Sequence, residues 1–318
     1  MNPVADALQP LTAAPGASAG EPLPAPVADA RRRPPIEQCT LLVAGAVRNC
    51  ERRMRRDLEA IRRATAGAGF RRVLWLVVES DSEDRTVALL EDLRREWQDF
   101  DFLSLGRTRD RHPLRTDRIA RSRNAYLRAL EEDVRYADVT HVLVADLDGV
   151  CADLTAQALA SCWQLPQPWS ACTANQGDYY YDLWALRHPV WCPDDVWVQR
   201  AALLPLLGPA QADSLALHSR MAHIPRSRPP IEVDSAFGGL ALYRRDALRG
   251  ARYDGLDEAG AERCEHVALN AQLRAAGHRI FIHPGLINAR KTSHASRKKL
   301  WRSLRRAVWN WVRRRVRD

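Results

Sequence analysis

The stretch Val142–Asp148, VLVADLD, decides how the rest of this sequence is interpreted. It begins with a run of apolar residues, which is typical of a short strand buried on both faces of a parallel sheet. Side chains at positions i and i+2 of a strand point to the same side, so Asp146 and Asp148 are predicted to project together. In open α/β sheets, ligands bind beyond the carboxyl ends of the strands. We therefore expect two neighbouring carboxylates at the ligand-binding edge of a sheet.

Strand-like and helix-like segments alternate on both sides of this stretch. N-terminal to it, the sequence predicts strands at 39–47, 71–80 and 100–106 and helices at 50–65, after 81–86 and at 115–134. C-terminal to it, the sequence predicts a strand and a short helix over 237–248, then a helix and a final strand over 264–286. This rhythm is typical of a doubly wound α/β fold, a mostly parallel sheet flanked by helices. We expect one domain over 38–290, with the Pro-rich residues 192–231 as an insertion or long loop.

The composition is that of a globular protein with an unusual N-terminal segment. The 318 residues are 46% hydrophobic and 27% charged, and no run of about 18 apolar residues suggests a membrane span. Residues 1–37 are rich in Ala and Pro without apolar periodicity, which predicts a disordered leader. The seven cysteines include no C-x-x-C pair, a pattern that favours reduced thiols and a cytoplasmic location.

The net charge of +9 is concentrated at the C-terminus. Residues 290–318 contain 12 Lys/Arg and one acidic residue, which leaves 36 basic and 38 acidic residues elsewhere. Residues 291–318 predict a basic amphipathic helix whose apolar side carries tryptophan. Such a helix suits an anionic membrane surface, so we expect peripheral association with the inner face of the membrane. Packing on its own domain is an open alternative, and the near-neutral body makes nucleic acid a disfavoured partner.

The two aspartates also predict a metal site. Adjacent carboxylates repel each other unless a cation lies between them. Their hard oxygens favour Mg²⁺ or Mn²⁺, with the phosphate groups of a substrate completing the coordination shell. Solvated turns also carry D-x-D sequences, and the buried strand before Asp146 is what favours the metal interpretation.

Two polar clusters accompany the aspartates. ESDSED, residues 79–84, follows the second predicted strand, and its oxygens suit a base edge or ribose or the N-terminus of the next helix. Arg115, Arg118 and Arg121 fall on one helical stripe, close to Arg123. Arginine forks suit phosphate oxygens, and a solvated basic face is the alternative.

Seven segments in order resemble a known family. The segments are AGAVRNC, ESDSEDRT, RIARSRNAYL, VLVADLDGVCADL, SACTANQGDYYYDLWALR, FGGLALYRRDAL and CEHVALNAQLRAAGHRIFIHPGLINA. Over residues 40–290 the chain resembles the capsule-associated cryptococcal mannosyltransferase family and, more broadly, GT-A glycosyltransferases. The resemblance implies a GT-A fold and transfer of a sugar, mannose in that family, from a GDP- or UDP-linked donor to a glycan or lipid-linked acceptor. It also implies surface polysaccharide or glycolipid synthesis.

The resemblance assigns roles to individual residues. Asp146, Asp148 and His283 correspond to ligands of the metal. The donor-binding positions are Ala44, Arg48, Asn49, Glu79, Asp81, Arg121, Arg123, Asn124, Asp146, Trp184 and Arg187. To these we add Gly239, where a glycine suits close approach of a ligand or of a neighbouring strand.

A carboxylate is the expected catalytic base. An inverting enzyme would use Glu265 or Asp182 to take the acceptor's proton, with His266 as the alternative base or ligand. The resemblance favours retention, in which the departing phosphate takes that proton, and the residues leave both outcomes open. Two functions from other classes are also open: a nucleotide-sugar-binding scaffold without turnover, and a nucleic-acid-binding protein that acts through the basic tail.

Overall fold

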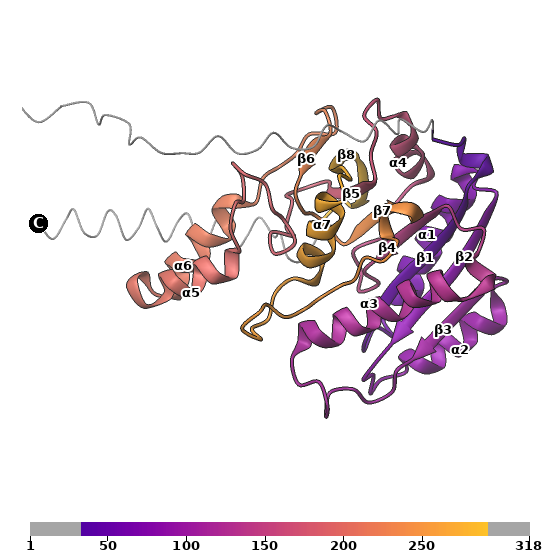
Figure 1. Cartoon of the computed structure of the whole chain (residues 1–318), viewed down its shortest axis with the longest axis horizontal. Coiled ribbons are helices and arrows are strands. Elements are labelled where there is room, and N and C mark those ends of the chain that lie inside the picture. Colours follow the sequence, from indigo (N-terminus) through magenta and orange to yellow (C-terminus); the bar gives the residue numbers. More distant parts are fainter. Residues whose placement is uncertain (1–32, 292–318) are drawn as a thin grey trace, which may run out of the picture. The chain divides into compact units, whose positions relative to one another are not determined.

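A computed structural model describes residues 33–291, which form one α/β unit (Figure 1). The strands are β1 Thr40–Val47, β2 Arg72–Glu79, β3 Phe100–Ser104, β4 His141–Ala145, β5 Ala171–Gln176, β6 Ile231–Val233, β7 Leu240–Arg244 and β8 Ile280–Ala289. The α-helices are α1 Met54–Ala68, α2 Thr86–Glu96, α3 Arg115–Glu132, α4 Ala156–Ala160, α5 Val196–Leu207, α6 Pro209–Ala216 and α7 Glu265–Ala275. The predicted leader and C-terminal helix lie outside these residues, apart from a few residues at their inner ends.

The strands form a single eight-stranded sheet in the order β3-β2-β1-β4-β7-β5-β8-β6. Strands β1 to β4 pair in parallel, as do β5 and β8, whereas β7 runs antiparallel between β4 and β5, and β6 runs antiparallel to β8. The prediction of a mostly parallel sheet flanked by helices is confirmed. Because β7 runs the other way, its first residues lie beside the last residues of β4.

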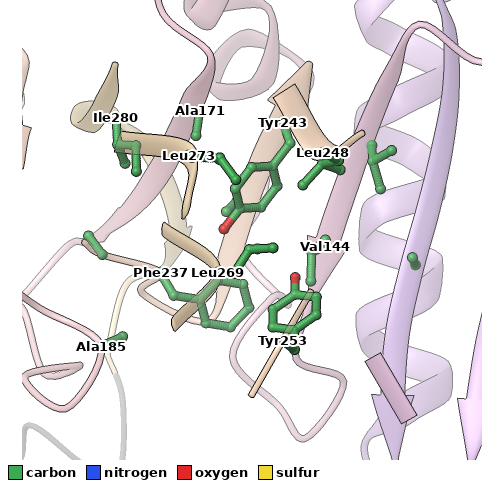
Figure 2. Packing of buried hydrophobic residues seen from close by; sticks show 14 of the residues in the cluster. Val144, Ala171, Ala185, Phe237, Tyr243, Leu248, Tyr253, Leu269, Leu273 and Ile280 are labelled. Carbon is green, nitrogen blue, oxygen red and sulfur yellow. The ribbon is translucent and has the colours of Figure 1, made fainter. Parts of the chain in front are cut away.

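Alternation along the strands divides the core between the two faces of the sheet. Leu42 and Leu76 face α3, and Leu41 and Val77 face α1. Figure 2 shows part of the first layer, where Tyr243 of β7 and Leu269 and Leu273 of α7 pack together. Strands buried on both faces therefore carry the near-continuous apolar runs seen in the sequence.

Residues 192–231 differ from the expected loop. They contain two short helices, α5 and α6, joined at Gly208, whose φ of +76° suits glycine, and Pro209 begins the second helix. Apolar residues continue through α5 without the 3.6-residue alternation that would have marked it as an amphipathic helix. Prolines at positions 205 and 209 made the segment look irregular.

Two observations concern cysteines and membrane spans. The seven cysteines all lie within the described residues, and all are free thiols. None of the helices in residues 33–291 has both the length and the hydropathy of a bilayer-spanning segment.

Candidate active site

A cavity of about 340 Å³ opens where β1 and β4 end. Its walls come from the loops after these strands, from α3 and from the start of α7. The lining residues include eight of the predicted site residues: Arg48, Arg123, Asp146, Asp148, Asp182, Trp184, Glu265 and His266. The cavity thus lies at the edge of the sheet where the strand pattern predicted a ligand.

The two aspartates of the D-x-D line this cavity together. Strand β4 ends at Ala145, and the Asp146 N–H donates to the carbonyl of Gly239 at 2.9 Å. Gly239 has a φ of +78°, and a Cβ there would meet the Tyr181 hydroxyl at 2.7 Å. A glycine at this position therefore lets β7 begin directly beside the first aspartate. Asp148, two residues further on, is exposed.

Buried Arg123 connects two acidic residues of the cavity. It lies in the middle of α3 and is 3% exposed. Its Nη2 donates to Asp146 Oδ1 at 2.9 Å and its Nε to Glu265 Oε1 at 3.0 Å. The guanidinium also lies over the rings of Phe237 and Tyr253, at 5.1 and 5.6 Å from their centroids. Arg123 therefore fixes a carboxylate after β4 relative to one at the start of α7.

Carboxylates crowd this small volume, and their pKa values shift accordingly. Burial, followed by repulsion from Asp148 and other carboxylates, raises the pKa of Asp146 to about 7 despite the opposing charge of Arg123. Burial and the charge of Glu265 also raise the pKa of Asp182, whose Oδ2 accepts the Gly238 N–H at 2.8 Å. The cavity therefore holds carboxyl groups that bind a proton or a cation more readily than exposed ones.

His266 lines the same cavity as a neutral ring. It stacks on Phe237, with ring centroids 3.7 Å apart, and meets Tyr253 edge-on. Burial and the charge of Arg123 lower the pKa of His266 well below its usual value. Within the described part of the chain neither ring nitrogen has a hydrogen-bond partner, so the ring can accept or donate one bond to a ligand.

A buried carboxylate that the sequence analysis missed holds the loop after the D-x-D. Asp57, on α1, is 0% exposed, and its two oxygens accept the N–H groups of Gly149 at 2.6 Å and Cys151 at 3.3 Å. One turn earlier, Arg53 donates to the carbonyl of Asp148 at 2.9 Å. These bonds clamp the loop to α1. The sequence did contain a signal for this role, because Asp57 lies on the apolar face of a predicted helix. An acidic side chain in such a position is rarely buried without hydrogen-bond partners.

The acidic turn after β2 uses its carboxylates within the protein. Glu79 accepts the Ser82 N–H at 2.8 Å and the Ser104 hydroxyl at 2.5 Å. Asp81, at a φ of +60°, accepts two N–H groups and the Thr108 hydroxyl. Neither side chain lines the 340 Å³ cavity. Their local role is to fix the 104–109 loop.

Three other predicted donor-binding side chains are held outside the cavity. Asn124 exchanges hydrogen bonds with the backbone of Tyr253, at 2.8 and 2.9 Å. Arg121 pairs with Asp117 one turn earlier on α3. Arg187 donates to the carbonyls of Trp184 and Leu186 and pairs with Asp195 at 2.7 Å. Of the predicted arginine stripe, Arg115 and Arg118 line the cavity and Arg121 does not.

The remaining predicted residues lie around the first strand and on the last one. Ala44 is buried within β1, and Asn49 lies in an adjoining hollow of about 540 Å³ that shares Arg48 and Asp148 with the cavity. His283, on β8, does not line the cavity, and its Nε2 lies 2.7 Å from Ser161 Oγ. The structure does not bring it to the aspartates because it precedes, by five residues, the part of β8 that reaches Gly238 through Asn288.

The donor set fits a hard divalent cation only in part. Asp146 keeps 35% of its side chain exposed where it lines the cavity, and Asp148 is exposed beside it. In residues 33–291 no group of three His, Cys, Asp or Glu side chains is arranged to hold a metal. Mg²⁺ is commonly bound by one or two carboxylates together with substrate phosphates and water, and two aspartates meet that requirement.

Comparisons with known proteins give similarity of structure only. No protein-family model matches the chain, and no curated protein does either. It is similar to TarS 1-349 of S. aureus, with 12% identity, a TM-score of 0.44 and coverage of 76% of this chain and 57% of that one. It is also similar to mannosyltransferase PcManGT from Pyrobaculum calidifontis, solved with GDP-Man and Mn²⁺. The identity is 16%, the TM-score is 0.43, and the match covers 80% of this chain and 58% of that one. The chain spans less than two thirds of the length of either, so its chemistry has to be argued from its own residues.

Proposed function

We propose that the chain is a GT-A-type glycosyltransferase. It would move a sugar from a nucleoside-diphosphate donor, GDP- or UDP-linked, to a hydroxyl of a glycan or lipid-linked acceptor. The observation that carries this proposal is the shared cavity of Asp146, Asp148, Asp182 and Glu265 at the carboxyl ends of β1 and β4. Paired carboxylates beside arginines suit a pyrophosphate held through a cation, and two further carboxylates suit proton transfer.

The residues divide the work between binding and chemistry. Asp146 and Asp148 would hold Mn²⁺ or Mg²⁺, which supplies positive charge to the leaving diphosphate when it is bound. Arg48, Arg115 and Arg118 line the same cavity and would neutralise the remaining phosphate charge. Trp184, also in the wall, offers an apolar face for a sugar ring.

The proton step falls to one of two carboxylates. Asp182 has a raised pKa, which suits a group that accepts a proton from a hydroxyl near neutral pH. Glu265 is held at a fixed position by Arg123. An inverting reaction would use one of them as the base, whereas retention would let the leaving phosphate take the proton.

The wider setting is part of the proposal. The family resemblance favours mannose as the transferred sugar. It favours a surface polysaccharide or a glycolipid as the product. A cytoplasmic enzyme that residues 291–318 hold at the inner face of the membrane would reach a lipid-linked acceptor. Nearly all of that segment lies outside the described residues.

A donor panel tests the function directly. Purified protein is incubated with GDP-, UDP- and CDP-linked sugars, with and without Mn²⁺, and release of free nucleoside diphosphate and thermal stabilisation are measured. The proposal expects metal-dependent release from at least one donor. Donor-induced stabilisation without release, even with acceptors supplied, would favour the binding scaffold. Absence of both would contradict the proposed site.

A further inference from the structure

The α5–α6 hairpin is apolar and exposed. In α5 only Val196 is buried, and Gln199 and Arg200 are its only polar residues. The large apolar side chains at its surface are 37–76% exposed, and they are Trp197, Val198, Leu204, Leu206, Leu207 and, on α6, Leu215. Soluble domains scatter such residues singly, whereas a cluster of this size marks a contact surface.

The hairpin stands apart from the layers around the sheet. Figure 1 shows α5 and α6 side by side, beyond α7 and away from α1 to α3. Within the described residues α5 packs chiefly against α6, and α6 against the turn that follows it. In residues 33–291 no helix other than α6 packs extensively against α5, so much of its apolar surface stays exposed within the described part of the chain.

The base of the hairpin contacts one residue of the cavity wall. Asp195 caps α5 by accepting the Trp197 N–H at 2.8 Å, and it pairs with Arg187 at 2.7 Å. Trp197 meets the cavity residue Trp184 edge-on, with ring centroids 6.4 Å apart. The first turn of α5 therefore lies next to the cavity wall at Trp184.

We infer that the α5–α6 hairpin inserts into the interfacial region of an anionic lipid bilayer. A helix of 12 residues is about 18 Å long, too short to span a bilayer of about 30 Å, so its exposed apolar surface can enter only the interfacial region. Tryptophan at its first turn suits the headgroup level. The occupant is a lipid surface that could also carry the acceptor of the proposed transferase reaction.

Charge favours a bilayer over the protein's own tail as the cover. The only charged residues of 196–216 are Arg200 and Asp213, which pair with each other. The hairpin therefore offers no negative surface to residues 292–318, which carry ten Lys/Arg and one Asp. An apolar hairpin without net charge and a cationic segment on one chain together provide the two signals that stable attachment to anionic lipid requires.

Vesicle binding of the full chain tests this inference. Wild-type protein should sediment with vesicles of phosphatidylcholine containing 30% phosphatidylglycerol. The double variant Val198→Asp/Leu206→Asp places charges on side chains that are 70% and 76% exposed, so folding should be spared. Its partition into vesicles should fall about tenfold or more. Each single variant, Val198→Asp or Leu206→Asp, should also weaken binding, whereas Val134→Asp, which adds the same single charge at an 85% exposed valine of another element, should bind as wild type.

Two further measurements separate the hairpin from other causes. In 0.5 M NaCl the electrostatic attraction between protein and vesicle is screened. Because the hairpin contributes apolar contact, the difference in vesicle binding between the wild type and the double variant should persist at this salt concentration. Trp197→Phe should reduce quenching of tryptophan fluorescence by brominated lipid. Equal binding of the double variant and the wild type to vesicles would overturn the inference. It would also be overturned if the wild type formed a concentration-dependent dimer and the double variant stayed monomeric, because the hairpin would then be a contact between two copies of the chain. The assay needs no donor, so its outcome is independent of the proposed transferase activity.

Discussion

Arg123 and Asp146 form an ion pair in which the arginine is almost completely enclosed, with Nη2 and Oδ1 2.9 Å apart. The same guanidinium holds Glu265. A single buried cation therefore sets the spacing between the proposed metal-binding aspartate and a candidate base.

Replacing Arg123 with Met should be strongly destabilising. The variant leaves Asp146 and Glu265 facing each other without their cation, and breaking a buried pair in this way costs about 3–5 kcal/mol. Urea unfolding at pH 7.5 measures the loss. Arg121→Met, which removes an exposed pair with Asp117 on the same helix, should change the free energy of unfolding by less than about 0.5 kcal/mol. Equal stability of the two variants would contradict the structural role of Arg123.

Replacing Asp148 with Ala should abolish Mn²⁺ binding while the fold survives, because this side chain is exposed. Paramagnetic resonance of free Mn²⁺ during a titration measures binding, and thermal unfolding without metal checks the fold. Asp110→Ala, at another exposed aspartate, is the control. Undiminished Mn²⁺ affinity in Asp148→Ala would remove the metal argument.

Mn²⁺ affinity should depend on pH through Asp146. Its pKa is raised to about 7, and a proton competes with the metal for the carboxylate. Affinity should therefore rise about tenfold per pH unit below 7 and level off above it. Titrations between pH 5.5 and 8.5 test this. A flat profile over that range would show that Asp146 does not bind the ion.

Asp57→Asn should change how stability depends on pH. Burial raises the pKa of Asp57 to about 6, so the native protein keeps a proton that the unfolded chain has lost between pH 4 and 6. The free energy of unfolding contributed by this group therefore falls as pH rises through that window, by up to about 3 kcal/mol. Chemical unfolding at several pH values should show that the free energy of unfolding falls less, or rises more, between pH 4 and 6 in the variant than in the wild type. An unchanged slope would mean that Asp57 titrates normally.

Glu265→Gln should reduce turnover about 10²-fold or more while the donor Kd changes little, if this carboxylate is the base. Steady-state release of nucleoside diphosphate and donor titration separate the two effects. Glu262→Gln changes a nearby carboxylate that holds Thr116 and is absent from the cavity wall, so turnover should stay close to wild type. Comparable losses of turnover and donor affinity would give Glu265 a positioning role.

The sequence predicted the sheet well, for a physical reason. Apolar runs such as 142–145 mark strands buried on both faces, and the ends of parallel strands meet at one edge, where Asp146 and Asp148 line the cavity. Their binding of a metal stays a prediction. Prediction was weaker where a side chain's partners are distant in sequence. The carboxylate of Asp81 is used by a loop almost thirty residues away, and that of Asp57 by one more than ninety residues away.

The hairpin shows a second limit of sequence reasoning. Hydrophobic periodicity detects a helix only when one face is buried, and α5 is mostly exposed and almost entirely apolar, so its residues carried no alternating signal. His283 shows a third limit, because membership of the last strand did not specify how far along that strand the cavity lies.

The bonds from Arg53 and Asp57 to residues 148–151 have a mechanical consequence. Arg48 and Asn49 are followed by α1, the helix whose first turns make these bonds. The loop after β1 and the loop after β4 are therefore both attached to α1. A ligand that touches both loops would meet a template that is already assembled. Little ordering entropy would then oppose the binding of that ligand.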